Sequence, residues 1–234
     1  MEIAKNIALS AAFILSLLVF AYLYWRYFWF FRNPDRNIPD GENILSPADG
    51  TVVYVKRVGP DEPVVSIKKD KSLYLGDMIH EDLNEVNLLI GVFMSPLDVH
   101  YNRAPMSGIV DLIKHQPANP KNYHMFSMHW RSLMKRLPIY EKSPHIIHNE
   151  RTVTRIKGVF RNQPISCCVV QIAGGSVNGI DSYVHEGTMV EKGHIFGMIR
   201  IGSQVDVIVK WQESMNIKVK PGQKVRAGET IFID

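Results

Sequence analysis

The segment 151-RTVTRIKGVFRNQPISCCVVQIA-173 decides the fold class, because two apolar runs rich in β-branched residues flank a short polar turn. Runs of this length and composition, here Arg151–Phe160 and Ser166–Ala173, are typical of β-strands. The chain contains further runs of this type, separated by turns: Thr51–Val58, Val64–Ile67, Val86–Met94, Gly108–Ile113, His194–Ile201, Val205–Val209, Ile217–Lys220 and Thr230–Ile233. We therefore expect a mainly β domain, a sandwich or barrel-like fold with a few helices.

The N-terminal residues predict a transmembrane helix. Ile7–Tyr24 is an uncharged run of 18 residues, and about 20 apolar residues span a bilayer. Aromatic residues and three arginines follow it, which is typical of the cytoplasmic interface. The run is long for a secretory signal peptide and lacks a small-x-small cleavage site, while a buried core helix is a further alternative. We expect one N-terminal anchor in the cell membrane and a cytoplasmic catalytic domain.

The rest of the chain is expected to form one domain, since 234 residues suit a single globular core. Residues 33–43 are polar and contain two prolines and a glycine, which predicts a linker. The expected divisions are an anchor with its aromatic and basic flank at residues 1–32, the linker, and the domain at residues 44–234.

The net charge, the two cysteines and a pair of histidines limit which binding partners and metal ions we expect. The formal net charge of +4 fits an anionic lipid surface as well as nucleic acid. We expect a membrane partner and no nucleic acid, and self-association into a homo-oligomer stays open. The adjacent Cys167 and Cys168 lie in an apolar run and predict buried thiols in a reducing compartment. His145 and His148 lack further ligands around them, so we predict no metal.

One stretch, between Pro120 and Pro138, departs from the β pattern. Its apolar residues recur at helical spacing; they are Phe126, Trp130, Leu133, Met134 and Leu137. Two interpretations are open. The segment is a surface helix packed on the core, or it is a basic amphipathic segment that rests on a lipid surface near the mouth of the active site.

Three short segments carry the candidate chemistry: 46-SPADG-50, 93-FMSPLDVHYNRAP-105 and 199-IRIGSQVD-206. They supply Asp49, His100 and Ser203 beside turn residues, where side chains from several strand ends converge. One hypothesis is a membrane-bound serine hydrolase that acts on lipid with Ser203 as an uncleaved nucleophile. The Gly-x-Ser-x-Gly elbow is missing, which weakens it. A non-catalytic membrane-bound β scaffold is another alternative.

Five motifs occur together in one order: 30-FFRNPDR-36, 47-PADG-50, 96-PLDVHYNRAP-105, 149-NER-151 and the glycine-rich run from Gly193 to Ser203. In this combination the chain resembles the phosphatidylserine decarboxylase family, and especially its short bacterial and archaeal form. The resemblance implies a self-processing carboxy-lyase. Such an enzyme converts a phosphatidylserine-type lipid to the phosphatidylethanolamine-type lipid and CO2, and the sequence leaves open diacyl or archaeal ether-linked chains.

The resemblance also implies a cleavage site at the Gly202–Ser203 bond. The Ser203 hydroxyl would attack the Gly202 carbonyl, and glycine suits the strained turn that this attack needs. Cleavage would give a β chain of residues 1–202 and an α chain of residues 203–234. The α chain would begin with a covalently bound pyruvoyl group, derived from Ser203, that forms a Schiff base with the substrate. A second Gly-Ser bond, Gly175–Ser176, is the less favoured alternative.

The resemblance assigns roles to the remaining site residues. His100 is expected to be the base in self-cleavage and the later proton donor, and Asp49 to orient its ring. Long-form members have a second histidine where this chain has Arg103. Arg103 and Asn102 are expected to bind the substrate, Arg103 through its permanent cation. The alternative is that Arg103 only pairs with Asp98 or a backbone carbonyl.

Overall fold

The structure is a computed structural model that describes residues 1–234 except residues 61, 69–70, 75–83, 140–142, 176–178 and 201. The chain forms two compact units, Met1–Pro34 and Asp35–Asp234. Residues 35–43, which the sequence predicts to be linker, are part of the second unit.

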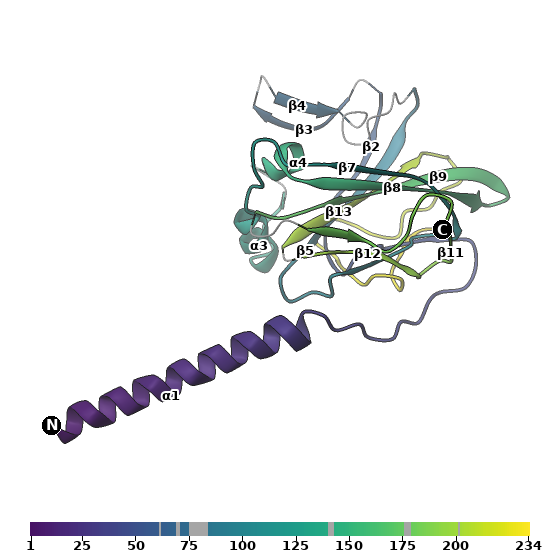
Figure 1. Ribbon diagram of the computed structural model, residues 1–234. Helices are drawn as coiled ribbons and strands as arrows, with labels where there is room; N and C mark the ends of the chain where they lie inside the picture. The colour runs from purple at the N-terminus through teal and green to yellow at the C-terminus, as the bar shows by residue number, and fades with distance from the viewer. Residues whose placement is uncertain (61, 69–70, 75–83, 140–142, 176–178, 201) are drawn as a thin grey trace. The chain divides into compact units, whose positions relative to one another are not determined.

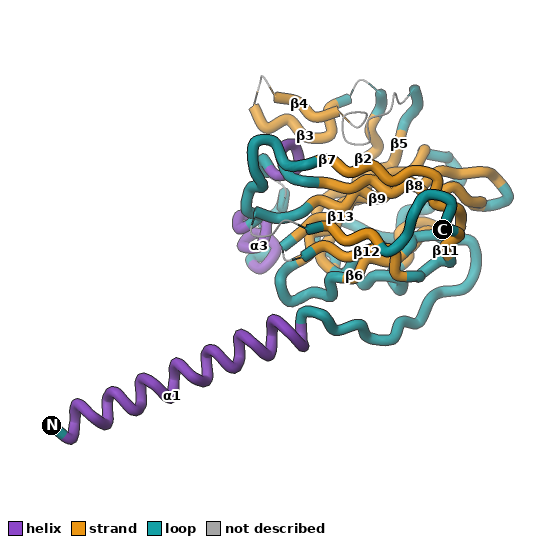
Figure 2. The backbone as a smooth tube through the Cα atoms, viewed as in Figure 1, coloured by secondary structure: helices purple, strands orange, loops and turns teal. Residues whose placement is uncertain are grey.

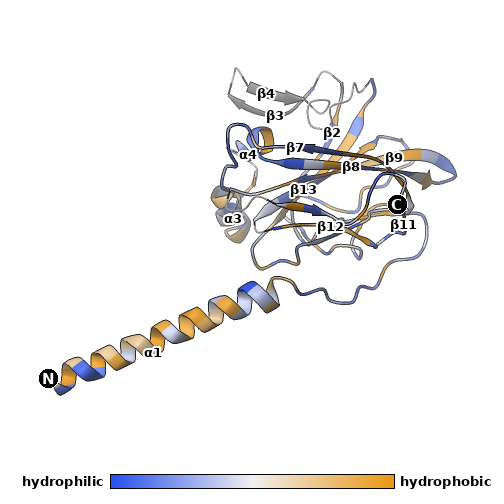
Figure 3. Cartoon of the chain, in the orientation of Figure 1, coloured by the Kyte–Doolittle hydropathy of each residue, from blue (hydrophilic) through white to orange (hydrophobic). Residues whose placement is uncertain are grey.

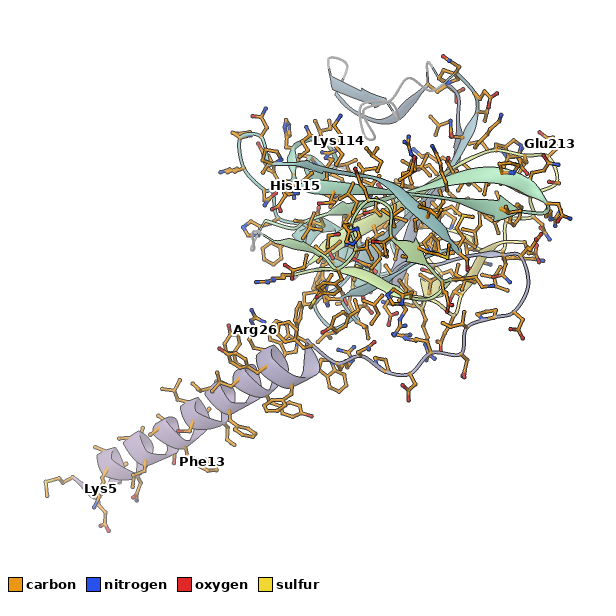
Figure 4. The ribbon with its side chains drawn as sticks, turned by 45° about the vertical axis from the view of Figure 1, so that its right-hand side comes forward. Lys5, Phe13, Arg26, Lys114, His115 and Glu213 are labelled. Carbon is orange, nitrogen blue, oxygen red and sulfur yellow. The ribbon has the colours of Figure 1, made fainter. Side chains whose placement is uncertain are left out.

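The first unit is helical. α1 (Glu2–Tyr24) continues into one π-helical turn, η1 (Trp25–Trp29). Figure 3 shows the apolar residues along α1, and Figure 4 shows the side chains of Lys5 and Phe13 projecting away from the helix. Within the described residues, Glu2–Trp29 is the one helix long and apolar enough to cross a membrane. The Arg26 guanidinium lies over the aromatic rings that follow α1, 5.4 Å from the ring centre of Phe31.

The second unit is built on one curled antiparallel sheet of eight strands, in the order β11-β7-β8-β9-β13-β5-β2-β14 (Figure 1). These strands are β2 (Gly50–Val58), β5 (Asn87–Met94), β7 (Gly108–Gln116), β8 (Arg151–Phe160), β9 (Gln163–Ile172), β11 (Met189–Val190), β13 (Ser203–Lys210) and β14 (Lys224–Val225). The mainly β prediction is confirmed. The predicted strand Ile217–Lys220 is wrong: Ile217 makes only an isolated bridge to Ile233, because Pro221 and Gly222 turn the chain.

Smaller elements complete the unit (Figure 2). A three-stranded sheet has the order β10 (Ile180–Ser182), β12 (Ile195–Ile199) and β6 (Tyr101–Arg103). β1 (Ile44–Leu45) pairs with β15 (Ile231–Ile233), and β3 (Pro63–Lys68) pairs with β4 (Lys71–Tyr74). The helices among the described residues of this unit are α3 (Phe126–Leu133) and α4 (His145–His148).

Each face of the large sheet is covered by its own hydrophobic core. Ala104, Phe196 and Phe232, from β6, β12 and β15 or their ends, pack on one face. Met128 and Ile146, from α3 and α4, pack on the other. The central strands are therefore buried on both sides, which explains why they read as nearly continuous apolar runs.

The adjacent cysteines illustrate this two-sided burial. Cys167 lies in one core and Cys168 in the other, because successive side chains of a strand point to opposite faces. Both are free thiols and both are buried, so the prediction of buried thiols is confirmed. Burial raises the pKa of the Cys167 thiol well above its usual value.

Candidate active site

The Gly202–Ser203 bond lies at the start of a central strand. Ser203 is the first residue of β13 and is fully buried, and its Oγ lies 3.3 Å from the sulfur of Met94. Gly202 has a φ of +57°, a left-handed conformation that glycine adopts at least cost. The space that a Cβ at this position would occupy is open. The bond therefore has a buried hydroxyl on one side and an accessible glycine in a left-handed conformation on the other.

Two ladders bring the loop that carries His100 to this bond. Met94, the last residue of β5, pairs with Ser203 in the large sheet. Tyr101, the first residue of β6, pairs with Met198 in the small sheet. The loop between β5 and β6 is thus held at both ends against the segment that leads into the Gly202–Ser203 bond.

The histidine of this loop is buried. His100 has no exposed surface, its Nδ1 lies 2.9 Å from the carbonyl oxygen of Asp98, and its carbonyl accepts a hydrogen bond from the Ile199 N–H. The contact with a carbonyl acceptor places the proton of a neutral ring on Nδ1 and leaves Nε2 as the basic nitrogen.

Asn102 lies close to Ser203 through a shared neighbour. Its Nδ2 lies 3.7 Å from the same Met94 sulfur and donates to the carbonyl of Pro47. Its Oδ1 accepts a hydrogen bond of 2.8 Å from Gln171. The buried amide therefore joins the Pro47 turn to the large sheet beside Ser203.

Asp49 has a different setting from the one expected. In the described part of the chain, its carboxylate accepts hydrogen bonds from the Arg36 guanidinium at 3.0 Å and from the Ala227 N–H at 2.7 Å, and not from His100. The Arg36 side chain is only 4% exposed and also lies 3.6 Å from Glu229. Asp49 is thus held by a residue that precedes the domain boundary expected from sequence.

Arg103 belongs to the same charged group. Its Nη1 donates to the Gly193 carbonyl at 2.8 Å, the kind of backbone contact that the structural alternative anticipates. Burial and the nearby Arg36 cation lower the pKa of Arg103, against the opposing effect of Asp49 and Glu229. In β6, Arg103 is half-buried while the neighbouring Asn102 is fully buried, so the two side chains point to opposite faces of the strand.

An apolar cavity of about 210 Å³ opens at Gly202. It is lined by Phe93, Pro96, His124, Met125, Phe126, His129, Gly175 and Gly202. A neighbouring cavity of about 840 Å³ is more polar and shares His124 and Gly175 with the first. The candidate bond therefore faces a cavity with mostly apolar walls and two imidazoles.

The Gly174–Gly175 pair has a packing role. A Cβ on Gly175 would lie 2.6 Å from the His124 backbone nitrogen, so only glycine fits this close approach. Asn149 holds the neighbouring backbone, because its amide donates to the carbonyls of Ala173 and Tyr123. Gly175 thus lines the cavity at Gly202, and Ser176 lies outside the described residues.

A buried polar network fills the other side of β13. The Tyr54 hydroxyl donates to Asp206 at 2.8 Å, and Gln204 Nε2 donates to both Tyr54 and Asp206 at 2.7 and 2.8 Å. His145 Nε2 lies 3.1 Å from Gln204 Oε1, so this nitrogen carries the proton. Burial raises the pKa of Asp206 to about 7 and lowers the pKa of His145 to about 4.

These two groups are expected to have opposite effects on stability. Asp206 prefers its protonated form in the folded state, so its contribution falls as pH rises from about 4 to about 7. His145 prefers its neutral form, so its contribution falls as pH drops from its usual 6.5 to about 4. Between about pH 4 and 6.5 the two contributions offset one another.

We expect the Asp206→Asn variant to reveal the His145 effect alone. Relative to the wild type, its free energy of unfolding should rise with pH by about 1.4 kcal/mol per unit between pH 5 and 6.5. Urea unfolding in detergent at several pH values measures this slope. The His145→Asn variant is the matched control and should show the opposite relative slope. Equal pH dependence in Asp206→Asn and the wild type would contradict the assignment.

The two histidines considered for metal binding have separate partners. His145 is bound to Gln204, whereas His148 Nδ1 lies 2.9 Å from the carbonyl oxygen of Asn119. Within the described residues, no group of three or more His, Cys, Asp or Glu side chains is arranged to hold a metal ion.

Sequence reasoning missed several residues around the bond. Arg36 and Arg151 lie inside motifs that the sequence shows, but their roles depend on the assembled fold: Arg36 pairs with Asp49, and the Arg151 cation acts electrostatically on Asp206. Gln204 and Asp206 left a clearer signal, since polar residues alternate with valines in an apolar strand. Met94 left none, because its contact with Ser203 arises from strand pairing.

Comparisons with known proteins identify the family of the chain. The family model described as phosphatidylserine decarboxylase matches residues 23–233. A putative archaetidylserine decarboxylase proenzyme of Methanocaldococcus jannaschii is 39% identical over 205 residues, which cover 87% of each chain. Two phosphatidylserine decarboxylase proenzymes are also similar. That of Carboxydothermus hydrogenoformans is 34% identical over 94% of this chain and 84% of its own. That of Streptomyces griseus is 32% identical over 86% and 71%.

Proposed function

The chain belongs to the phosphatidylserine decarboxylase family, and from this premise we propose that it cleaves itself at Gly202–Ser203 and then decarboxylates a serine-headgroup phospholipid. The enzyme class is that of a carboxy-lyase of phospholipid biosynthesis. The identity of the cleaved bond, the roles of the site residues and the pyruvoyl group are our proposals beyond this family assignment. The substrate is a phosphatidylserine-type lipid, with ester or ether chains.

The observation that carries the proposal is the position of the bond between two ladders. The pairing of Met94 with Ser203 and of Tyr101 with Met198 holds the two ends of the His100 loop beside Ser203 and Met198. The same bond opens to a cavity through Gly202. A buried nucleophile, a buried imidazole and an accessible glycine in a left-handed conformation suit an internal acyl shift.

Self-cleavage would proceed in three steps. The Ser203 Oγ attacks the Gly202 carbonyl carbon, and the C–N bond breaks, so that an ester replaces the peptide bond. Loss of a proton from Cα of Ser203 then expels the Gly202 carboxylate and leaves a dehydroalanine. Addition of water to its imine tautomer releases ammonia and leaves a ketone at position 203.

The first step needs a base, because a serine hydroxyl is a weak nucleophile at neutral pH. The thioether next to Ser203 Oγ is only a weak hydrogen-bond acceptor and does not fill this role. We propose that His100 takes the proton. Asp49 would orient the His100 ring only if its carboxylate exchanged the hydrogen bond from Arg36 for one from the imidazole. In the present arrangement the Asp49–Arg36 pair stabilises the Pro47–Gly50 turn.

The surroundings of position 203 fit a pyruvoyl group. The strand start is buried, and the adjoining cavity has mostly apolar walls, which exclude water from a reactive carbonyl. When present, the group supplies a conjugated carbonyl that accepts the electrons released with CO2. We propose that Arg103 binds the anionic headgroup and that Asn102, beside Met94, contacts it through its amide. His100 would return a proton to the product.

We also propose that Glu2–Trp29 anchors the enzyme in the cell membrane, with the second unit in the cytoplasm. The apolar helix has the necessary length. Arg26, in the last turn of this helix, and Arg32, after its end, favour the cytoplasmic side. The α and β chains of one proenzyme would remain together at this surface.

Intact-mass measurement on the purified protein tests the cleavage site. We expect two chains, residues 1–202 and residues 203–234, the second blocked at its N-terminus by a carbonyl. Borohydride should reduce that carbonyl and abolish CO2 release. An active, uncut chain would instead indicate a serine hydrolase, and a fragment that begins at residue 176 would place the cleavage at the other Gly-Ser bond.

A further inference from the structure

Helix α3 is fixed to the second unit by one of its faces. Met125 and Met128 are buried in the core beneath it. The Ser132 hydroxyl donates to the Thr51 hydroxyl at 3.0 Å, and the His129 ring packs against Phe93 with 6.3 Å between the ring centres. The helix is therefore docked, and the packing face is not the apolar face that the periodicity predicts.

The predicted apolar face points to solvent. Phe126 is 73% exposed, Trp130 59% and Leu133 64%, and the face continues into the following turn with Met134 and Leu137, both also exposed. The helix thus packs on the core, as one interpretation of the sequence has it, but it does so through its other face. A contiguous exposed patch with large aromatic and aliphatic side chains is typical of an interaction surface.

Cations lie beside the apolar patch. Arg131, Lys135 and Arg136 lie in the last turn of α3 and the residues after it, and Lys135 and Arg136 are exposed. Within Phe126–Leu137 the chain has no acidic residue. An apolar face bordered by lysine and arginine matches an anionic bilayer, whose interface accepts the apolar side chains while its headgroups attract the cations.

The patch is continuous with the candidate active site. Phe126 belongs to the exposed face and also lines the cavity at Gly202, together with Phe93 and His129. Most of the other walls of that cavity are apolar. A lipid that leaves the bilayer at α3 therefore meets an apolar path to the candidate bond.

We propose that α3 and the turn after it, residues 126–137, insert their apolar face into the interface of an anionic bilayer and admit the lipid substrate to the cavity at Gly202. This proposal rests on the proposed function, because it takes the substrate to be a membrane lipid. A second copy of the chain is the competing occupant. The bilayer is favoured because residues 126–137 carry Arg131, Lys135 and Arg136 and no acidic residue in their sequence, and because the lipid must reach Gly202.

Site-specific labels test the insertion on the full-length protein. Trp130→Cys and Glu213→Cys variants are labelled with an environment-sensitive fluorophore, since both native cysteines are buried. Glu213 is exposed and follows the end of β13 opposite to Ser203, at the edge of the unit in Figure 4. In vesicles of phosphatidylglycerol and phosphatidylcholine with nitroxide lipids, the label at 130 should be blue-shifted and quenched, and the label at 213 should not.

Kinetics on two substrate forms test the admission of lipid. The double variant Trp130→Ser/Leu133→Ser should lose about tenfold in turnover of long-chain phosphatidylserine in vesicles, because its apolar face is reduced. Turnover of a short-chain, monomeric phosphatidylserine should stay within about twofold, because the residues that carry the chemistry are unchanged. Val159→Ser is the matched control: Val159 is 58% exposed, on the β8–β9 hairpin, and both activities should stay at wild-type level.

Several results would overturn the proposal. The first is equal blue shift and quenching of the fluorophores at 130 and 213. The second is quenching of the label at 130 by a second labelled copy of the chain rather than by nitroxide lipid. The third is an equal loss of turnover on the long-chain and short-chain substrates. Self-cleavage is scored on the same samples by gel. A chain that never cleaves but inserts residue 130 into the bilayer refutes the proposed function and supports the proposed membrane surface. A chain that cleaves and is active but does not insert residue 130 supports the proposed function and refutes the membrane surface.

Discussion

Replacement of Ser203 with alanine should leave a single uncut chain of 234 residues and reduce CO2 release at least about a thousandfold, to the background rate. Alanine removes the only atom that can attack the Gly202 carbonyl, so no ester forms and no chain end is produced. The same loss removes the source of the carbonyl at position 203. The fold should persist, because among the described residues the buried hydroxyl makes its hydrogen-bond contact with the Met94 sulfur, and alanine fits the same space.

Gel electrophoresis and CO2 release on the purified variant measure this effect. Ser182→Ala is the control, since Ser182 is an exposed serine whose hydroxyl donates to the Val184 carbonyl. It should cleave and turn over lipid as the wild type does. A cut and active Ser203→Ala chain would refute both the cleavage site and the origin of the carbonyl.

Replacement of His100 with alanine should slow self-cleavage at least about a hundredfold, the usual contribution of a positioned general base. His100 is fully buried in a loop held by two ladders, so solvent does not replace the missing base. The fraction of uncut chain, followed over days after synthesis, measures the rate. A His100→Ala chain that cleaves at the wild-type rate and turns over lipid would remove the mechanism.

Two further variants separate chemistry from folding at this position. His100→Gln keeps a polar side chain in the buried loop, and it should fold with wild-type thermal stability yet fail to cleave. His185→Ala removes an exposed imidazole at a turn, and it should cleave normally. A destabilised His100→Gln protein would instead indicate that His100 mainly supports the loop.

The large sheet was predictable because its central strands carry the signal in their own residues. β8, β9 and β13 are long, apolar and β-branched, and two-sided burial makes them stand out. The short strands β6 and β10 were not predicted, since three residues hold too little pattern. They form because distant partners supply their hydrogen bonds.

The candidate site divides in the same way. Local motifs identify Asp49, His100 and Ser203 as candidates, but no local rule shows that Arg36 takes the Asp49 carboxylate. The helical period of residues 126–137 predicts α3 correctly, but a period does not say what the apolar face meets. Pairing across the fold and the direction of a face both depend on the assembled structure.

The place of β13 in the sheet has a consequence for the cut protein. β13 is hydrogen-bonded along its length to β5 on one side and to β9 on the other. After cleavage at Gly202–Ser203, the piece that begins at residue 203 would supply an inner strand of the sheet, and it would also carry β14 and β15. Scission would divide the polypeptide without disrupting the sheet. The two chains should therefore co-purify as one complex and separate only when the whole domain unfolds.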